Sequence, residues 1–425
     1  METQNYFKRI ADQLLQDRLR SSGAVLVEGP KWCGKTATST RASKSQLFMQ
    51  DPDKSTSYLI AADTKPSLLL QGETPRLLDE WQSAPVLWDA VRFMVDQRGG
   101  KPGQFILTGS AVPKDDVIQH TGTGRISRLM MRPMSLYESL ESNGMISLKS
   151  LFDGKDNLEG FSQLSIENIA STIVRGGWPA SIGNDQSIAL RHAVDYVEAI
   201  INADISRVDD IEKNPARVRA LMRSYSRNIS TMATIRTIRD DIALGDANTT
   251  ISEKTISQYL TALDRIFVTE NLPAWNPALR SKTAIRTSVK RHFVDPSIAT
   301  AVMRLTPTRL LEDFQYFGFL FESLCTRDLR VYAEAIDGQL FHYRDASGLE
   351  SDTVVCLNDG RWAPIEIKLG SREIEEAAEH LLELKAKVDT KKMKEPSFLM
   401  ILTATEFAYR RDDGVLVVPI GCLKH

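Results

Sequence analysis

The 425-residue chain has few cysteines, no long apolar run and almost no net charge. Its cysteines, Cys33, Cys325, Cys356 and Cys422, show no C-x-x-C spacing. This scatter argues against a zinc site and favours free thiols in a reducing compartment. The longest apolar stretch, at 398–402, is far shorter than the roughly 20 residues of a membrane span, and the charged start lacks the apolar segment of a signal peptide. We therefore expect a cytoplasmic protein without membrane contact.

The charge and the length limit the classes of protein further. A formal net charge of −2 excludes a surface that attracts nucleic acid over its whole extent, so any such binding needs local basic patches. Hydrophobic residues make up 42% and charged residues 25%, which is typical of globular proteins. The chain is too long for one ordinary core. We expect an α/β multidomain protein with domains at 1–150, 151–305 and 306–425.

Between residues 23 and 134, short apolar runs alternate with helical patterns. The candidate strands are 24–28, 46–50, 76–80, 104–109 and 127–133. The segment 85–98 has the apolar spacing of a helix, with a proline at its start and glycines after it. Alternating strands and helices predict a parallel sheet with helices on both faces.

A phosphate-binding motif follows the first apolar run directly. The sequence G-P-K-W-C-G-K-T matches G-x-x-x-x-G-K-[ST] between a strand and a helix. This phosphate-binding loop (P-loop) comprises Gly29, Pro30, Lys31, Trp32, Cys33, Gly34, Lys35 and Thr36. Glycines let backbone N–H groups turn toward phosphate oxygens, and the next helix directs its positive dipole end to the same anion. We expect Lys35 to reach the terminal phosphates and Thr36 to bind Mg²⁺, with ATP as the ligand.

Two further strands end in residues that suit phosphate hydrolysis. "LLDE" ends in Asp79, expected to hold Mg²⁺ through water, and Glu80, expected to polarise the attacking water. "ILTGS" places Thr108 and Ser110 at the tip of the next strand, where they could sense the γ-phosphate or position that water. The alternatives are a pair of acids that begins a loop and a simple turn.

Four segments together carry a family resemblance: "GPKWCGKT", "RLLDEWQSAP", "FILTGSAVP" and "TGTGRISRLMMRPMSLYES". They resemble bacterial and archaeal AAA-type P-loop ATPases fused to a C-terminal domain of unknown function, with a winged-helix part and a PD-(D/E)XK-nuclease-like end. The resemblance covers nearly the whole chain and allows a homo-oligomer. It suggests Arg125 as a charge-stabilising arginine, with Arg132 as a competitor. Either could instead be a surface salt-bridge partner.

The middle of the chain has a basic stretch and a helix with a polar face. From Lys213 to Arg239 seven residues are Lys or Arg and none is acidic. A helix predicted from Ser252 precedes a second basic segment, 280–292. A helix followed by a basic hairpin fits a winged helix that reads DNA, which the resemblance also implies. DNA, or another nucleic acid, is thus expected at 213–239 and 252–292. A solvated charged face, a protein-docking module and a lid on the ATPase domain are the alternatives.

The last domain brings acids onto a predicted hairpin. Asp352 precedes Glu366-x-Lys368, in which both side chains share one strand face. Two carboxylates on adjacent strands can hold a second divalent metal that generates hydroxide, with Lys368 supporting the nucleophile and Glu322 completing the site. This is the arrangement of restriction-endonuclease-like folds. Domains of this fold either cleave nucleic acid or serve as scaffolds.

Two functions follow from these patterns. One is an AAA-type ATP hydrolase that couples nucleotide state to nucleic-acid binding, with or without metal-dependent cleavage. The other is a slow ATP-gated switch that binds DNA or a protein partner and has a non-cleaving C-terminal scaffold. Both require Lys35, Thr36 and Asp79. They differ in their use of Glu80 and of the C-terminal acids.

Overall fold

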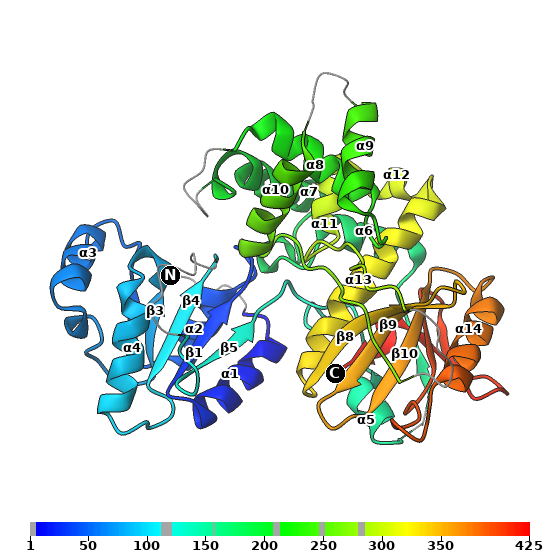
Figure 1. The fold of residues 1–425 in the computed structure, drawn as a ribbon, viewed down its shortest axis with the longest axis horizontal. Coiled ribbons are helices and arrows are strands. Elements are labelled where there is room, and N and C mark those ends of the chain that lie inside the picture. The colour runs from blue at the N-terminus through cyan, green and yellow to red at the C-terminus, as the bar shows by residue number, and fades with distance from the viewer. Residues whose placement is uncertain (1–5, 112–120, 156–157, 207–212, 246–250, 279–284) are drawn as a thin grey trace.

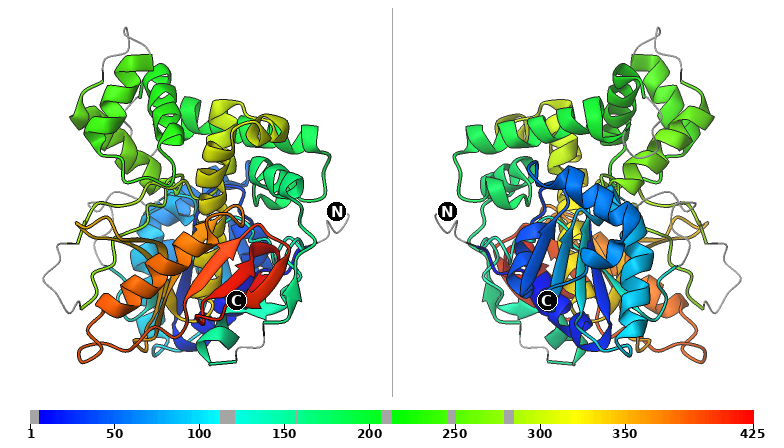
Figure 2. Two further views of the ribbon diagram at one scale, coloured as in Figure 1. Left: turned by 90° about the vertical axis from the view of Figure 1, so that its right-hand side faces the viewer. Right: turned by 90° about the vertical axis from the view of Figure 1, so that its left-hand side faces the viewer.

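The computed structural model describes residues 6–111, 121–155, 158–206, 213–245, 251–278 and 285–425. Two sheet-containing regions lie beside each other, and a helical middle region lies above both of them (Figures 1 and 2). Within the described ranges, every helix is too short or too polar to cross a membrane.

The first region is built on a five-stranded sheet in the order β2-β3-β4-β1-β5, in which every pair is parallel. The predicted parallel sheet is thereby confirmed. Its strands are β1 Ala24–Glu28, β2 Ser45–Phe48, β3 Arg76–Asp79, β4 Phe105–Gly109 and β5 Ile126–Met130. Its helices are α1 Ile10–Ser21, α2 Lys35–Ala42, α3 Ser55–Thr64 and α4 Val86–Gln97, with short 3₁₀ turns η1 Pro66–Leu68 and η2 Trp81–Ser83.

Both faces of this sheet are buried, because successive side chains of a strand point to opposite faces. Ala24 and Leu26 of β1 pack with the apolar residues of α4. Val25 and Val27 pack on the other side, against Leu15 and its neighbours in α1. The parallel register places the carboxyl ends of β1, β3 and β4 at one edge of the sheet, and the predicted ATP-site residues follow those ends.

The middle region is helical. It contains α6 Ile166–Arg175, η3 Pro179–Ser181, α7 Gln186–Ala199, the π-helical turn η4 Ile200–Asp204, α8 Pro215–Arg227, α9 Ile235–Gly245, α10 Glu253–Arg265, α11 Ser297–Met303 and α12 Pro307–Leu311.

After α10 two arms of the chain, residues 268–278 and 285–294, lie side by side, and we call them the connecting hairpin. Its arms form antiparallel bridges at Thr269–Phe293 and Leu272–Lys290. Farther out, the same arms bridge to the C-terminal region at Ala274–His342 and Ile285–Asp345. The predicted basic residues Arg280 and Lys282 lie outside the described residues. The hairpin therefore joins the middle and C-terminal regions.

The C-terminal region has a seven-stranded mixed sheet in the order β7-β12-β13-β11-β10-β9-β8. Its elements are α13 Phe314–Glu334, β8 Gly338–Arg344, β9 Glu350–Leu357, β10 Trp362–Lys368, α14 Ile374–Lys387, β11 Met400–Thr403, β12 Phe407–Arg410, β13 Leu416–Pro419 and η5 Ile420–Cys422. Leu324 of α13 belongs to the cluster that buries Ile365 of the sheet, whereas α14 packs with Ile401 and Val417. The two helices therefore cover opposite faces.

An earlier segment of the chain also belongs to this C-terminal region. β6 Ile146–Ser147 pairs with β14 Leu423–Lys424, and β7 Gly160–Phe161 pairs with β12. Between them, α5 Leu148–Phe152 contributes the ring of Phe152, whose centroid lies 5.0 Å from that of Phe398. The boundary predicted at residue 150 therefore falls inside a segment that packs with the C-terminal sheet.

Candidate nucleotide site and carboxylate cluster

The P-loop connects β1 to α2 and wraps around the Lys35 ammonium. Lys35 Nζ donates to the carbonyls of Gly29 at 2.9 Å and Pro30 at 2.7 Å. Gly29 has a φ of 147°, and a Cβ there would lie 2.1 Å from the carbonyl oxygen of Met131, so no side chain fits. Gly34, with a φ of 102°, precedes the first residue of α2. The loop thus has the close backbone path that phosphate binding needs.

The predicted magnesium residues meet beside this loop. Thr36 Oγ1 donates to Asp79 Oδ1 at 2.9 Å, and Thr108 Oγ1 donates to the same oxygen at 2.6 Å. Among the described residues, Asp79 forms no ion pair. Hydroxyl and carboxylate oxygens are the ligands that Mg²⁺ prefers, so Thr36 and Asp79 fit this ion.

Glu80 is held next to Asp79 by a strained backbone. Its φ of 55° places a non-glycine residue in the left-handed region. Its N–H donates to Thr108 Oγ1 at 3.1 Å, and its Oε2 accepts from Ser110 Oγ at 3.1 Å and from Gln82. A single hydrogen-bond network therefore contains the residues predicted for this site: Thr36, Asp79, Glu80, Thr108 and Ser110.

Arg9 supports the P-loop, although no motif in the sequence marks it. The residue is 4% exposed, and its guanidinium donates to the carbonyls of Cys33 and Arg132, both at 2.7 Å. Its charge pairs with Glu138 at 3.1 Å. Cys33 is buried, and its thiol donates to the carbonyl of Met131.

A cavity of about 750 Å³ lies next to the start of α2. Residues from four parts of the chain line it, among them Tyr6, Arg9, Trp32, Thr38, Met134, Pro179 and His192. Tyr6 is fixed there by a 2.7 Å hydrogen bond between its hydroxyl and Thr38 Oγ1. The cavity has both apolar and hydrogen-bonding walls beside the P-loop, as sites for small ligands do.

The outer residues of the P-loop contact the middle region. Lys31 Nζ lies 2.6 Å from Asp204 Oδ1, at the end of the π-helical turn η4. The Trp32 ring lies 5.8 Å from the Tyr196 ring, which also packs against Trp178 at 4.5 Å. Lys31, Tyr196 and Asp204 line a cavity of about 280 Å³ together with Glu80 and Ser110. The middle region therefore covers the Glu80 side of the site.

Arg125 is not placed to contact a phosphate at the P-loop of its own chain. Its carbonyl accepts from the N–H of Ala24, the first residue of β1, whereas the P-loop begins after the last residue of that strand. At about 3.3 Å per residue, the length of β1 separates them by roughly 15 Å. The Arg125 guanidinium lies 2.9 Å from Asp96.

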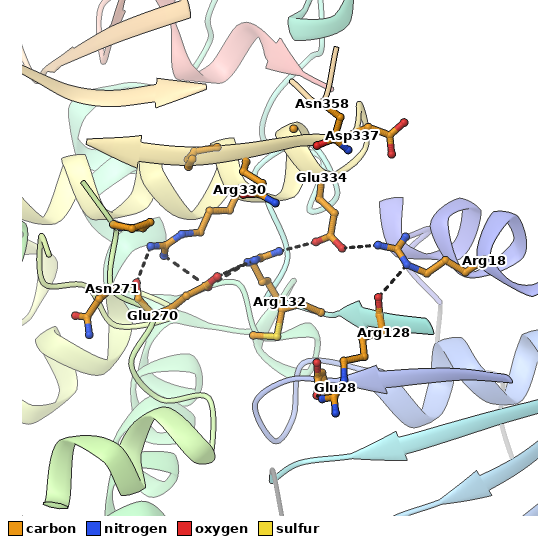
Figure 3. Close-up of a pocket in the computed structure, with 15 residues that line it drawn as sticks. Arg18, Glu28, Arg128, Arg132, Glu270, Asn271, Arg330, Glu334, Asp337 and Asn358 are labelled. Atoms are coloured by element: carbon orange, nitrogen blue, oxygen red, sulfur yellow. Dashed lines mark hydrogen bonds and ion pairs between the residues drawn. The ribbon is translucent and has the colours of Figure 1, made fainter. Parts of the chain in front are cut away.

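Arg132 lies in an ion-pair network between the three regions rather than at the phosphate site. It lies 2.7 Å from both Glu270 of the connecting hairpin and Glu334 of α13. Figure 3 shows Arg132 between these acids, with Arg18 and Arg330 at the two ends of the network. The network lines a cavity of about 410 Å³. Arg132 is therefore engaged with acids, as the salt-bridge alternative expected.

The basic stretch of the middle region is largely paired with acids. Arg219 binds Glu198, Arg227 binds Asp241, and Arg239 binds Asp240 and Glu253. Arg217 and Arg223 of α8 remain exposed, as do Lys254, Ser257 and Gln258 of α10. Of the seven basic residues in this stretch, Arg217 and Arg223 are exposed and form no ion pair within the described residues.

The predicted C-terminal site residues do converge, but they meet around a second lysine. Lys290 Nζ lies 2.8 Å from Glu322 Oε1 and 3.1 Å from Asp352 Oδ1. Lys368 Nζ lies 2.7 Å from Glu366 Oε2 and 3.5 Å from Asp352 Oδ2. Lys290 comes from the connecting hairpin, where the sequence pattern had predicted DNA contact. We refer to these five residues as the carboxylate cluster.

Burial and charge act in opposite directions on this cluster. Burial raises the pKa of Glu322 to about 8, although Lys290 partly offsets it. Burial would also raise the pKa of Asp352, but Lys290, Lys368 and the Ile367 N–H together hold it well below its usual range. For Glu366, burial and the nearby Asp352 charge raise the pKa. The pKa of Lys290 is raised because its two acids outweigh burial.

The cluster does not fit the second metal that was predicted for it. Across the described ranges, no group of three or more His, Cys, Asp or Glu side chains is arranged to hold a metal ion. The Lys290 ammonium takes the space between Glu322 and Asp352, and it would repel a divalent cation there. The expected second metal at Glu322, Asp352 and Glu366 is therefore not supported.

Comparison with protein families agrees with the N-terminal geometry. Residues 21–140 match a family described as AAA domain. Residues 166–309 and 317–423 each match a family described as a domain of unknown function, DUF8612 and DUF4143 respectively. The first match supports an AAA-type P-loop ATPase domain, as the motifs predicted.

Individual relatives are more distant. The uncharacterized protein Rv2008c of Mycobacterium tuberculosis is 24% identical over 375 residues, which cover 85% of this chain and 74% of that protein. The uncharacterized protein Mb2031c of Mycobacterium bovis matches to the same extent.

Two solved structures also align with much of the chain. The Walker-type ATPase PABY2304 of Pyrococcus abyssi has a TM-score of 0.41 at 14% identity, over 70% of this chain and 96% of its own. The ORC2 protein of Aeropyrum pernix has a TM-score of 0.33 at 13% identity, over 73% of this chain and 91% of its own.

Proposed function

We propose that this protein binds and hydrolyses ATP at the P-loop and transmits the nucleotide state to its middle region. The observation that carries the proposal is one hydrogen-bond network that joins Thr36, Asp79, Glu80, Thr108 and Ser110 beside the loop. Its carboxylates are held by hydroxyl, amide and backbone groups, so they remain available to a cation and to water.

Each residue then has a separate task. Lys35 exchanges its two carbonyl acceptors for phosphate oxygens when a triphosphate enters the loop. Thr36 and Asp79 hold Mg²⁺, which neutralises phosphate charge when it is bound. Glu80 accepts a hydrogen bond from the attacking water and orients it, while Ser110 fixes the Glu80 carboxylate. The 750 Å³ cavity beside α2 receives the nucleoside.

The contacts of the P-loop with the middle region supply the coupling. When Lys35 leaves the carbonyls of Gly29 and Pro30, the loop that carries Lys31 and Trp32 changes its internal hydrogen bonds. Those two residues contact Asp204 and Tyr196, so nucleotide binding alters the contacts of η4 and α7. A π-helical turn is a common feature of functional sites, and here it ends at the residue that pairs with Lys31.

The test is a comparison of Lys35→Ala with Lys44→Ala, an exposed lysine of the same domain. Lys35→Ala should abolish binding of a fluorescent ATP analogue and ATP turnover, and Lys44→Ala should leave both unchanged. Wild-type affinity in Lys35→Ala would contradict the proposal. Quenching or enhancement of Trp32 fluorescence by ATP, lost in Trp32→Phe, would report the coupling separately.

Duplex DNA is a second candidate ligand, favoured by the exposed Arg217 and Arg223 on α8 and the exposed polar face of α10. Phosphate contacts release counterions, so log Kd should vary with log salt by about 0.9 per contact. Arg217→Ala with Arg223→Ala should reduce that slope by roughly two units. A flat salt response of the parent chain would exclude DNA and leave a protein partner for this face.

Arg125 retains a role only toward a neighbouring copy of the chain. Its side chain is 46% exposed at the sheet edge opposite the P-loop. If a homo-oligomer places it at a neighbour's site, pure Arg125→Ala should lose turnover, and excess Lys35→Ala subunits, which supply an intact Arg125, should restore it. Unchanged turnover in the pure Arg125→Ala variant would assign this residue to its pair with Asp96.

A further inference from the structure

Lys290 is the one member of the carboxylate cluster that another region supplies. Glu322 comes from α13, Asp352 from β9, and Glu366 and Lys368 from β10, all in the C-terminal region. Lys290 lies on the returning arm of the connecting hairpin, and its backbone bridges to Leu272 of the outgoing arm. The lysine is 8% exposed, and Glu366 is fully buried.

Both carboxylate oxygens of Asp352 already have partners. Its Oδ1 faces Lys290 at 3.1 Å, and its Oδ2 accepts from the N–H of Ile367 at 2.9 Å and lies 3.5 Å from Lys368. A divalent ion bound to Asp352 would have to displace the Lys290 ammonium or approach within contact distance of it. The electrostatic repulsion of two cations so close in a buried site opposes their joint occupancy.

The rest of the hairpin fixes Lys290 in this position. The N–H of Trp275 donates to the His342 carbonyl at 2.6 Å, and the N–H of His342 donates to the Pro273 carbonyl at 2.9 Å. On the returning arm, the N–H of Arg286 donates to the Arg344 carbonyl at 2.9 Å. The hairpin thus adds backbone pairing at the β8 edge of the C-terminal sheet, and its residue Lys290 brings a cation to the carboxylate cluster.

We propose that Lys290 is a built-in counter-ion that occupies the cation position of the carboxylate cluster and thereby locks the middle region onto the C-terminal region. The C-terminal region in this arrangement is a docking scaffold for the hairpin and not a metal-dependent nuclease. The assignment does not depend on ATP binding. It explains why acids in a nuclease-like order are buried together without a group suited to hold metal: the charge that they need comes from within the chain.

The experiment compares the full chain with Lys290→Ala and with Arg286→Ala, which removes an exposed cation from the same hairpin. All three proteins carry Asp79→Asn, so that the P-loop acid does not contribute a metal response. Thermal unfolding is measured with and without millimolar Mn²⁺, and bound Mn²⁺ is counted by electron paramagnetic resonance.

The parent chain and Arg286→Ala should bind no Mn²⁺ at the cluster and keep their unfolding midpoint when it is added. Lys290→Ala should unfold at least about 5 °C lower, because Glu322 and Asp352 lose their shared counter-ion, and Mn²⁺ should restore part of that loss. Glu366→Gln placed on Lys290→Ala should remove the restoration.

Three results would overturn the proposal. One is Mn²⁺ binding to the parent chain that Glu366→Gln abolishes, since metal and Lys290 would then coexist. Another is an unchanged midpoint in Lys290→Ala. The third is Mn²⁺-dependent DNA cleavage by the wild-type chain that Lys368→Ala removes. If Lys290→Ala does not fold, the Mn²⁺ count and the cleavage assay on the parent chain still decide the question.

Discussion

Two sets of acids that look alike in the sequence have opposite electrostatic surroundings. Asp79 and Glu80 at the P-loop contact hydroxyl, amide and backbone groups, and within the described residues neither is in an ion pair. Asp352 and Glu366 lie against lysine ammonium groups at 2.7–3.5 Å. The first set keeps a negative charge for an incoming cation. The second is balanced from within the chain.

Burial explains why the two sets differ. Asp79 and Glu80 are partly exposed at a sheet edge, where water and a bound ion can solvate them. Asp352 on β9 and Glu366 on β10 are buried, and an unpaired carboxylate is costly in such a position. A buried acid has to be protonated or paired with a cation, and the lysines from two regions provide the pairing.

The largest expected effect is on stability at the carboxylate cluster. Asp352→Asn leaves Lys290 and Lys368 each with one acid fewer in a buried site, so it should lower the free energy of unfolding by about 3–5 kcal/mol. Asp359→Asn, on the exposed turn that follows β9, is the matched control and should not change the denaturation midpoint. Equal denaturation curves for Asp352→Asn and wild type would contradict the claim that Asp352 stabilises the fold as the partner of buried lysines.

Asp79→Asn should lower ATP turnover and leave stability unchanged. Turnover of ATP should fall by about 10²–10³-fold, because a charge that acts on the phosphate transition state is lost. The free energy of unfolding should stay near wild type, because no cation of the described residues pairs with this carboxylate. Asp96→Asn, which removes the partner of Arg125 at the other sheet edge, is the control for turnover. A large loss of stability in Asp79→Asn would show that the acids at the P-loop, like those of the carboxylate cluster, are needed for the fold.

The joint between the hairpin and β8 should weaken in acid. His342 is buried, and burial lowers its pKa to about 4 from 6.5, while its Nε2–H donates to the Ser288 carbonyl at 2.8 Å. Its neutral ring stabilises the fold above pH 6.5, and up to about 3 kcal/mol is lost as pH falls from 6.5 to about 4. His342→Gln keeps a donor that does not titrate and should flatten this part of the stability–pH profile. An unchanged stability–pH profile in His342→Gln would contradict the assignment of this acid sensitivity to His342.

The smallest effect concerns the contact between the P-loop and the middle region. Lys31 is 44% exposed, so its pair with Asp204 contributes at most about 1 kcal/mol to stability. Because the Asp204 carboxylate competes with phosphate for Lys31, Asp204→Asn should tighten ATP binding up to about fivefold. Glu198→Gln, which frees Arg219 elsewhere in the middle region, should leave ATP affinity unchanged. Weaker ATP binding in Asp204→Asn would assign that carboxylate a supporting role.

The sequence was sufficient for the P-loop edge because its signals are local. An apolar run followed by glycines and Lys35 fixes a strand, a turn and a helix within a few residues. The strand-terminal positions of Asp79, Thr108 and Ser110 then follow from the geometry of a parallel sheet, in which these ends meet. The strand ranges predicted from apolar runs agree with β1 to β5 to within a few residues.

The contacts that sequence reasoning missed join distant segments. Lys290 stands in a basic run that suggested DNA, yet its partners Glu322 and Asp352 lie 32 and 62 positions away. Arg9 reaches residues 24 to 129 positions away. A single sequence shows which residues are charged but not which of them folding brings together. Likewise, the position of Arg125 at the sheet edge opposite the P-loop could be found only from the register of β1 and β5.

The chain visits the C-terminal sheet twice, and this has a consequence for how the molecule is made. β6 and β7 emerge from the ribosome well before their partners β14 and β12, so their backbone groups stay unpaired until the last strands appear. The five-stranded sheet needs no residue beyond Met130 and can close during synthesis. Synthesis from the N-terminus therefore allows the first region to fold early. Until the last strands are made, β6 and β7 are exposed to proteases and chaperones.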